Sequence, residues 1–348
     1  MRTLVTGHAG YIGSVLVEEL LAGGHDVVGL DTCFYDRCDF TDALPEIPAL
    51  RLDVRDVTGA ALGGFDAIVH LAALSNDPLG ALNPRLTDDV NFGATARLAA
   101  AAKAAGVRRF VFASSCSMYG AADGDGPVDE TAPLRPLTEY ARSKVRSEQA
   151  LLELADDKFS PVLMRNATVY GVSPRLRVDL VVNNLVGWAL TTGKVRILSD
   201  GTPWRPLVHV RDVAAATVAM LEAPRDVVHA EAFNVAPLDE NYQVRDVAEI
   251  VRDAVGDCEL ELAGTGDPDT RSYRVDFTKL ARTLPDLELR WTVAKGAREL
   301  VDAYRSRGLD LDEFQGPRYT RLRRLQELLD AGALDSELRW NGVAAEAS

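Results

Sequence analysis

The chain has 348 residues, an apolar fraction of 47% and a formal net charge of −14. That length and composition suit one large α/β domain or two modest ones, each with a substantial core. The negative charge argues against nucleic acid as a partner, because a polyanion would be repelled and no basic run compensates. No apolar run reaches the ~18 uninterrupted residues of a membrane helix, and no signal peptide precedes the first strand. We therefore expect a cytoplasmic protein without membrane contact.

The four cysteines, Cys33, Cys38, Cys116 and Cys258, form no C-x-x-C pair. Zinc and redox-pair interpretations are therefore weak, and no histidine lies near Cys33 and Cys38 to complete a ligand set. We expect free thiols in a reducing compartment and no bound metal.

Strand-type and helix-type segments alternate in the first half of the chain. Continuous apolar strands that alternate with helices are typical of a doubly wound parallel sheet in an α/β protein. The expected strands are Thr3–Thr6, Asp26–Leu30, Ala49–Leu52, Ala67–Leu71, Arg109–Ala113 and Val162–Arg165. The expected helices are Ile12–Ala22, Leu86–Ala105 and one that begins near Thr138.

The pattern becomes less regular after about residue 170 and predicts a smaller α/β lobe over the carboxyl edge of the sheet. The expected helices there are Asp179–Thr191, Val210–Glu222, Val244–Val255 and Ala294–Arg305, and the expected strands are Val195–Leu198, Leu207–His209, Ala232–Val235 and Ser272–Val275. A basic amphipathic helix over Arg318–Leu329 is expected to pack on its own domain rather than on a partner. We assign residues 1–170 to the sheet domain with contributions from about 207–235, residues 171–310 to the lobe and residues 311–348 to a helical tail.

A glycine-rich segment, Thr6–Gly13, follows the first strand and opens the first helix. Gly7, Gly10 and Gly13 recur every three residues, which suits a tight turn, close backbone approach to a pyrophosphate and close helix–strand packing. The helix N-terminus at Tyr11 and Ile12 offers N–H groups and a positive dipole end to the same pyrophosphate. Its position between strand and helix makes this segment a dinucleotide site rather than a plain loop.

Asp31 ends the second strand, 18 residues after Gly13. A carboxylate there accepts hydrogen bonds from ribose hydroxyls and repels a 2′-phosphate, which favours NAD over NADP. Because of Arg37, NADP stays an alternative cofactor. Two further segments follow the third and fourth strands, where small residues let the backbone approach the cofactor: Asp53-Val54 and Leu71-Ala72-Ala73.

Tyr140 and Lys144 stand four residues apart on an expected helix, so both project from one face. A nearby cation stabilises phenolate and lowers the pKa of a tyrosine from about 10 toward neutral. Tyr140 can then accept a proton from a hydroxyl or donate one to a carbonyl. Ser114 and Ser115 end the fifth strand, at the crevice of such a sheet, where a hydroxyl can bind the same substrate oxygen.

Together these segments resemble the extended short-chain dehydrogenase/reductase superfamily, in particular its NAD-dependent nucleotide-diphosphate-sugar epimerases and dehydratases. The similarity extends over roughly residues 1–300, through Ser114–Gly120, Arg165–Gly171, Asn183–Leu185 and Gly201–Asp212. It implies a Rossmann-type fold, a tightly held NAD that takes a hydride from the sugar, most often at C4, and returns it, and a homodimer. It also implies that Asn91 contacts the cofactor and Ser75 the substrate.

Within the family, the segment Ser115–Gly120 separates the reactions. Dehydratases that eliminate the C6 hydroxyl carry Asp and Glu as acid and base where this chain has Cys116 and Ser117, so elimination by that route lacks its catalysts. The 4-epimerases carry small neutral residues here. A cysteine acid/base of certain 3,5-epimerases stands one position later, at Ser117. Cys116 is therefore either an inward-facing acid/base or, as we favour, a small packed residue.

The resemblance also implies substrate contacts. Asn184 corresponds to an asparagine that meets the diphosphate, and Arg205 to a phosphate-binding arginine whose fork suits two phosphate oxygens. A later arginine of the family has no counterpart at the matching position of this chain, and we assign its place to Arg271. At the position of Thr168 the family frequently has an asparagine that faces the sugar. We expect the nearby Asn166 to compensate for its absence. Cys116 and Ser117 complete the expected set.

The favoured function is inversion at C4 through a transient 4-keto sugar. The alternatives are a 4-ketoreductase or another dehydratase on the same scaffold, and, from a different class, a non-catalytic dinucleotide-binding protein. Such proteins often lose the tyrosine or the lysine, and both are present here. The expected dimer would pair the helices Leu86–Ala105 and Thr138–Leu154.

Overall fold

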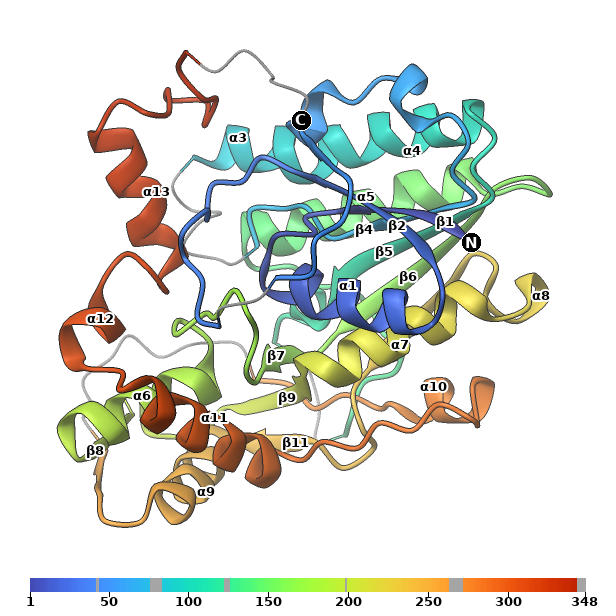
Figure 1. Ribbon diagram of the computed structural model, residues 1–348. Coiled ribbons are helices and arrows are strands. Elements are labelled where there is room, and N and C mark those ends of the chain that lie inside the picture. Colours follow the sequence, from blue (N-terminus) through green and yellow to red (C-terminus); the bar gives the residue numbers. More distant parts are fainter. Residues whose placement is uncertain (42–43, 76–82, 122–125, 198, 263–271, 343–348) are drawn as a thin grey trace.

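The computed structural model describes residues 1–348 except 42–43, 76–82, 122–125, 198, 263–271 and 343–348 (Figure 1). Its centre is a seven-stranded parallel sheet in the order β10-β6-β5-β4-β1-β2-β3. The strands are β1 Arg2–Thr6, β2 Asp26–Asp31, β3 Ala49–Arg51, β4 Ala67–His70, β5 Arg109–Ser115, β6 Ser160–Asn166 and β10 Glu231–Val235. This sheet confirms the predicted Rossmann-type α/β fold. The order reverses between β1 and β4, which opens a crevice at their carboxyl ends.

Helices cover both faces of the sheet, α1 and α7 on one and α4 and α5 on the other (Figure 1). Neighbouring residues of β1 are buried on opposite faces of the sheet: Val5 joins the hydrophobic cluster of α1 and α7, and Leu4 joins that of α4 and α5. The helices are α1 Tyr11–Ala22, α4 Ala94–Ala104, α5 Glu139–Leu154 and α7 Val210–Glu222.

The helix expected over Leu86–Ala105 is interrupted. The structure has α3 at Pro84–Asp88, a π-type turn at Asp89–Gly93 and then α4. Asn91 lies in this turn, where its side-chain oxygen accepts from the Leu74 N–H at 2.8 Å and its amide donates to the Leu74 carbonyl at 3.1 Å. Through these hydrogen bonds the turn fixes the loop that follows β4. Hydrophobic periodicity alone could not predict this interruption of the helix.

The second lobe contains two small sheets, β11-β9-β7 and β12-β8. Its strands are β7 Thr168–Tyr170, β8 Lys194–Ile197, β9 Trp204–His209, β11 Asn241–Gln243 and β12 Glu259–Leu262, and its helices include α6 Val181–Thr192, α9 Val244–Val255 and α11 Val293–Arg307. Between β9 and β11, the chain returns to the main sheet through α7, α8 (Arg225–Val228) and β10. The strand expected at Ser272–Val275 was wrong, because Val275 makes an isolated bridge with Val128 and a short helix, α10 (Thr278–Thr283), follows.

The C-terminal tail runs from the lobe back to the sheet domain (Figure 1). It contains α12 (Leu311–Gln315) and α13 (Arg321–Asp330), which begins three residues later than expected. Leu325 and Leu328 pack in one hydrophobic cluster with Leu74 and with Leu86 of α3, so α13 packs on its own chain as expected. No helix in the described ranges is long and apolar enough to cross a membrane.

Candidate active site

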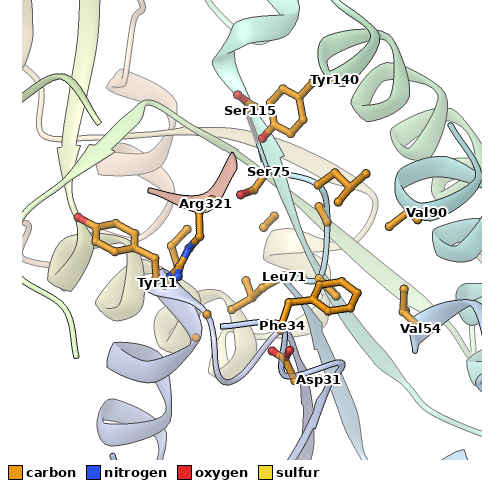
Figure 2. Close-up of a pocket in the computed structure, with 18 of the residues that line it drawn as sticks. Tyr11, Asp31, Phe34, Val54, Leu71, Ser75, Val90, Ser115, Tyr140 and Arg321 are labelled. Carbon is orange, nitrogen blue, oxygen red and sulfur yellow. The ribbon is translucent and has the colours of Figure 1, made fainter. Parts of the chain in front are cut away.

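A cavity of about 320 Å³ opens at the carboxyl ends of β1, β2, β4 and β5, within the size range of small-molecule sites (Figure 2). It brings together most of the residues expected from the sequence. Those that line it are Gly7, Gly10, Tyr11, Ile12, Gly13, Asp31, Asp53, Val54, Leu71, Ala72, Ala73, Ser75, Ser114, Ser115, Ser117, Tyr140, Lys144, Asn166 and Thr168. Asn91, Cys116, Asn184 and Arg205 do not line it, and Arg271 lies outside the described residues.

The glycine-rich turn has no room for side chains at two positions. Gly7 has φ +75°, and a Cβ there would lie 2.8 Å from the Ala72 nitrogen. A Cβ on Gly13 would lie 2.1 Å from the Gly7 carbonyl oxygen. These contacts let the loop after β4 and the start of α1 approach closely, which is the geometry that a dinucleotide requires.

Helix α1 presents its N-terminus to the cavity. Its first helical hydrogen bond runs from Ser14 N to Gly10 O, so the N–H groups of Tyr11, Ile12 and Gly13 precede it. Gly10 provides no side-chain cap, and no acidic residue lies in the first turn. These N–H groups and the helix dipole therefore suit a phosphate.

Two carboxylates line the cavity, those of Asp31 and Asp53. Asp31 accepts hydrogen bonds from Ala9 N at 3.2 Å and Cys33 N at 2.8 Å, which fixes its carboxylate beside the glycine turn. Asp53 forms a bidentate ion pair with Arg55, at 3.0 and 2.7 Å. Burial alone would raise the pKa of Asp53, but the hydrogen bonds and charge of Arg55 outweigh it and hold the pKa below its ordinary value. Asp31 is suited to accept hydrogen bonds from ribose hydroxyls, whereas the Asp53 carboxylate is held by Arg55.

Tyr140 and Lys144 project from the first turns of α5. Thr138 caps this helix by accepting from Ala141 N at 3.2 Å. The Lys144 ammonium lies 5.7 Å from the Tyr140 ring centre and donates to the Ala113 carbonyl at 2.6 Å. Burial lowers the pKa of Lys144 to about 7, and the nearby Glu148 partly opposes that shift. The pair expected from the i, i+4 spacing is therefore formed.

Ser115 completes this group from the end of β5. Its hydroxyl oxygen accepts from Ser117 N at 3.2 Å, which leaves its own hydrogen free to be donated elsewhere. In Figure 2 the Ser115 and Tyr140 side chains lie together at one end of the cavity, with both hydroxyl oxygens on the same side. Both residues therefore present their side chains to the same cavity.

Cys116 is buried in a polar network behind the cavity. Its thiol donates to the Arg165 carbonyl at 3.1 Å, and burial raises its pKa well above the ordinary value. Arg165 also forms a buried ion pair with Glu148 of α5 at 2.7 Å and donates to the Tyr119 hydroxyl at 3.0 Å. Of the two interpretations of Cys116, the packed residue fits this geometry.

Asn166 and Ser117, two of the residues expected to contact the substrate, line the cavity, and the Asn166 Oδ1 and Ser117 Oγ atoms are buried without a hydrogen-bond partner among the described residues. Asn184 donates to the Val178 carbonyl at 2.9 Å, and Arg205 donates to the Trp204 carbonyl at 2.8 Å. Their assignment to a substrate diphosphate stays a prediction.

Several lining residues were missed by the sequence interpretation. Arg177 forms a bidentate ion pair with Asp179 at 3.0 and 2.7 Å and donates to Ser75 at 3.1 Å. Arg321, from the tail helix, also lines the cavity. The amphipathic pattern of that helix indicated burial of its leucines, but nothing in the pattern indicated a buried arginine. The other missed residues include Phe34, Tyr35, Leu74, Val90 and Leu338.

Comparison with known proteins identifies the family. Residues 3–236 match the model of the NAD dependent epimerase/dehydratase family. The chain belongs to this family. It is 33% identical over 322 residues to the UDP-glucose 4-epimerase of Mycolicibacterium smegmatis, which covers 88% of this chain and 99% of that protein.

Two solved structures show the same architecture. The NAD-dependent NDP-hexosamine 5,6-dehydratase TunA superposes with a TM-score of 0.78 at 26% identity, covering 89% of this chain and 99% of that one. MoeE5 in complex with UDP-glucuronic acid and NAD gives a TM-score of 0.75 at 29% identity, covering 89% and 100%.

NAD is the cofactor of this family, and the residues of this chain fit it. Gly7 and Gly13 have no side chains, so a ligand can approach the backbone of the turn closely. The N-terminus of α1 faces the cavity, and Asp31 provides a carboxylate for the ribose. Within the described ranges, no group of three or more His, Cys, Asp or Glu side chains is placed to hold a metal ion. The chain is thus an NAD-dependent enzyme of the nucleotide-sugar epimerase/dehydratase class.

Proposed function

We propose that this enzyme inverts C4 of a nucleotide-activated sugar. The observation that carries the proposal is the distribution of charge in the cavity: among the described lining residues the carboxylates are Asp31 and Asp53, beside the glycine turn and Arg55 rather than beside Tyr140. Ser115 and Ser117, which line the cavity from the end of β5 and the turn after it, are neutral. This suits exchange of a proton and a hydride at one carbon, and neither side chain is an acid or a base for removing a hydroxyl.

Each residue has a defined role in this reaction. NAD, held by the glycine turn, the N-terminus of α1 and Asp31, would supply a hydride acceptor and donor for C4. Tyr140 takes the proton of the C4 hydroxyl and gives it back, while Ser115 donates a hydrogen bond to the same oxygen. Lys144, held by the Ala113 carbonyl, supplies the cation beside the phenol. Return of the hydride to the opposite face of the 4-keto sugar gives the epimer.

The relatives indicate which nucleotide and which sugar to test first. Both the UDP-glucose 4-epimerase and the MoeE5 complex with UDP-glucuronic acid favour a UDP-sugar as the first substrate to test. Asn166 and Thr168, which line the cavity near Ser115, are our candidates for contacts to the sugar ring.

The decisive experiment incubates the purified enzyme with UDP-, dTDP-, GDP-, ADP- and CDP-sugars and follows the C4 configuration by NMR. A 4-epimerase interconverts one pair without net consumption of NADH. Absence of interconversion with every donor would refute the proposal. Stoichiometric loss of NADH absorbance would indicate a 4-ketoreductase instead, and an enal or glycal product a dehydratase.

A second measurement separates the two interpretations of Cys116. Because its thiol faces the Arg165 carbonyl, we expect Cys116→Ala to retain most of its turnover. Abolished turnover in a folded variant would show that Cys116 is an acid/base.

The homodimer is proposed on the outer faces of α4 and α5, which pack against each other on one side of the sheet. Light scattering coupled to size-exclusion chromatography measures the mass directly. A mass of 37.7 kDa, that of one chain, would contradict the dimer.

A further inference from the structure

Arg321 places a guanidinium in the wall of the cofactor cavity. It is the first residue of α13, in the C-terminal tail, and its exposed fraction is 2%. It lines the same cavity as Tyr11 and Ile12 at the N-terminus of α1. In Figure 2 its side chain runs from the tail toward the start of α1, between Tyr11 and Ser75.

The partners of this guanidinium are incomplete. Nη2 donates to the Arg175 carbonyl at 3.0 Å, and the plane lies over the Tyr35 ring, with Cζ 3.9 Å from its centre. Nη1 is buried and has no hydrogen-bond partner among the described residues. Within the same part of the chain, no carboxylate forms an ion pair with Arg321, whereas the neighbouring Arg177 is paired with Asp179.

Asp179 is near enough to favour the charged form of Arg321, but its carboxylate is ion-paired with Arg177. Burial of the Arg321 guanidinium therefore remains costly, and an anionic ligand would offset that cost. Burial lowers the pKa of Arg321 to about 10, which still leaves the group protonated at neutral pH. Arg321 and the N-terminus of α1 thus line one cavity, and both favour a negatively charged ligand.

We propose that Arg321 binds the diphosphate of NAD and that the C-terminal tail forms the outer wall of the cofactor site. A sugar nucleotide also carries a diphosphate, but the tail is held against the dinucleotide side of the cavity. Trp340 donates to the Thr32 carbonyl at 2.7 Å, next to Asp31, and Arg339 lies 3.3 Å from Asp53. The inference rests on NAD as cofactor and not on which sugar reaction the enzyme performs.

The test compares Arg321→Met with Arg323→Met, an exposed arginine of the same helix, in NAD-stripped protein. Titration calorimetry with NAD should show a dissociation constant raised about 10- to 100-fold in Arg321→Met, the loss of one charge-assisted contact, and unchanged in Arg323→Met. Melting of the NAD-free protein should be unchanged or higher in Arg321→Met, because an unpaired buried charge is removed. A residue that merely supports the fold would lower it.

Arg321→Lys keeps a point charge and should recover part of the affinity, which covers the case that the methionine variant does not fold. Equal affinity for NAD in Arg321→Met and in the wild type would overturn the proposal. Titration of the NAD-loaded protein with UDP is the second arm. Weaker binding of UDP with unchanged binding of NAD would assign Arg321 to the sugar nucleotide and also overturn it.

Discussion

The Lys144 ammonium donates a 2.6 Å hydrogen bond to the carbonyl of Ala113, two residues before Ser115 on the same strand. This bond ties the helix that carries Tyr140 to the strand that carries Ser115. The three groups proposed for catalysis are therefore positioned by one helix–strand contact.

Replacement of Tyr140 by phenylalanine removes the proposed proton acceptor and leaves the cavity otherwise intact. We expect turnover to fall by about 10²- to 10⁴-fold, the usual contribution of a positioned acid/base. NAD content should be unchanged, because the glycine turn and Lys144 remain. Rates come from the NMR assay and NAD content from the absorbance of the denatured protein. Full turnover in this variant would remove Tyr140 from the mechanism.

Lys144 should make stability depend on pH. Its folded-state pKa of about 7 lies below its ordinary value, so above pH 7 the unfolded chain holds a proton that the folded chain lacks. The unfolding free energy of the NAD-free wild type should then rise with pH relative to Lys144→Met, by up to about 1.4 kcal/mol per pH unit until about pH 10. Below pH 7 the difference should level off. Urea denaturation of both proteins across this range measures it, and parallel pH profiles would contradict it.

The buried ion pair between Glu148 and Arg165 supports the same helix. Glu148→Gln leaves the buried guanidinium without its counter-charge and should lower the unfolding free energy by about 3–5 kcal/mol. Glu139→Gln is the matched control, because its ion pair with Arg142 is exposed on the same helix and should contribute less than about 1 kcal/mol. Equal losses in the two variants would refute a special role for the buried pair.

Gly13→Ala tests the close packing of the glycine turn. Its methyl group would lie 2.1 Å from the Gly7 oxygen, so the turn must shift and NAD affinity should drop at least ~10-fold. Gly59→Ala is the control, because nothing lies within 4 Å of a Cβ there. Calorimetric titration with NAD measures both, and a Gly13→Ala protein that binds NAD normally would show that the turn tolerates a side chain.

Asp31→Asn tests the preference for NAD. The amide oxygen can still accept a hydrogen bond from Ala9 or Cys33, but the negative charge that repels a 2′-phosphate is gone. We expect the ratio of NADP to NAD dissociation constants to shift toward NADP by about 10-fold, equivalent to about 1.4 kcal/mol. An unchanged ratio would mean that another group selects the cofactor.

Local sequence was sufficient for most of the sheet domain. The glycine spacing, the apolar strands and the i, i+4 pair are short-range patterns, and the structure places Gly7, Asp31, Ser115, Tyr140 and Lys144 around one cavity as expected. These features depend on contacts within one strand–helix unit, so the pattern specifies them directly.

The failures arose where distant segments decide the structure. Asn91 interrupts a helix because its side chain pairs with the backbone of Leu74, and Val275 extends only as far as an isolated bridge to Val128. The pattern over Arg318–Leu329 predicted a basic amphipathic helix packed on its own domain but gave no sign that Arg321 is buried. That burial depends on Tyr35 and Arg175, which are far away in the sequence. The hydrophobic periodicity of a sequence contains no information about such long-range contacts.

The cofactor cavity is completed by residues of the C-terminal tail. The Trp340–Thr32 hydrogen bond joins residues 308 positions apart, so the pocket is completed by segments near both ends of the described chain. During synthesis the glycine turn and Asp31 emerge from the ribosome long before Arg321 and Leu338, so the complete lining of the cavity forms only after the C-terminal segment has been made. A ligand that binds only the finished pocket pulls the whole chain toward its folded state. NAD supply in the cell would thereby affect how much of this enzyme matures as well as how fast it turns over.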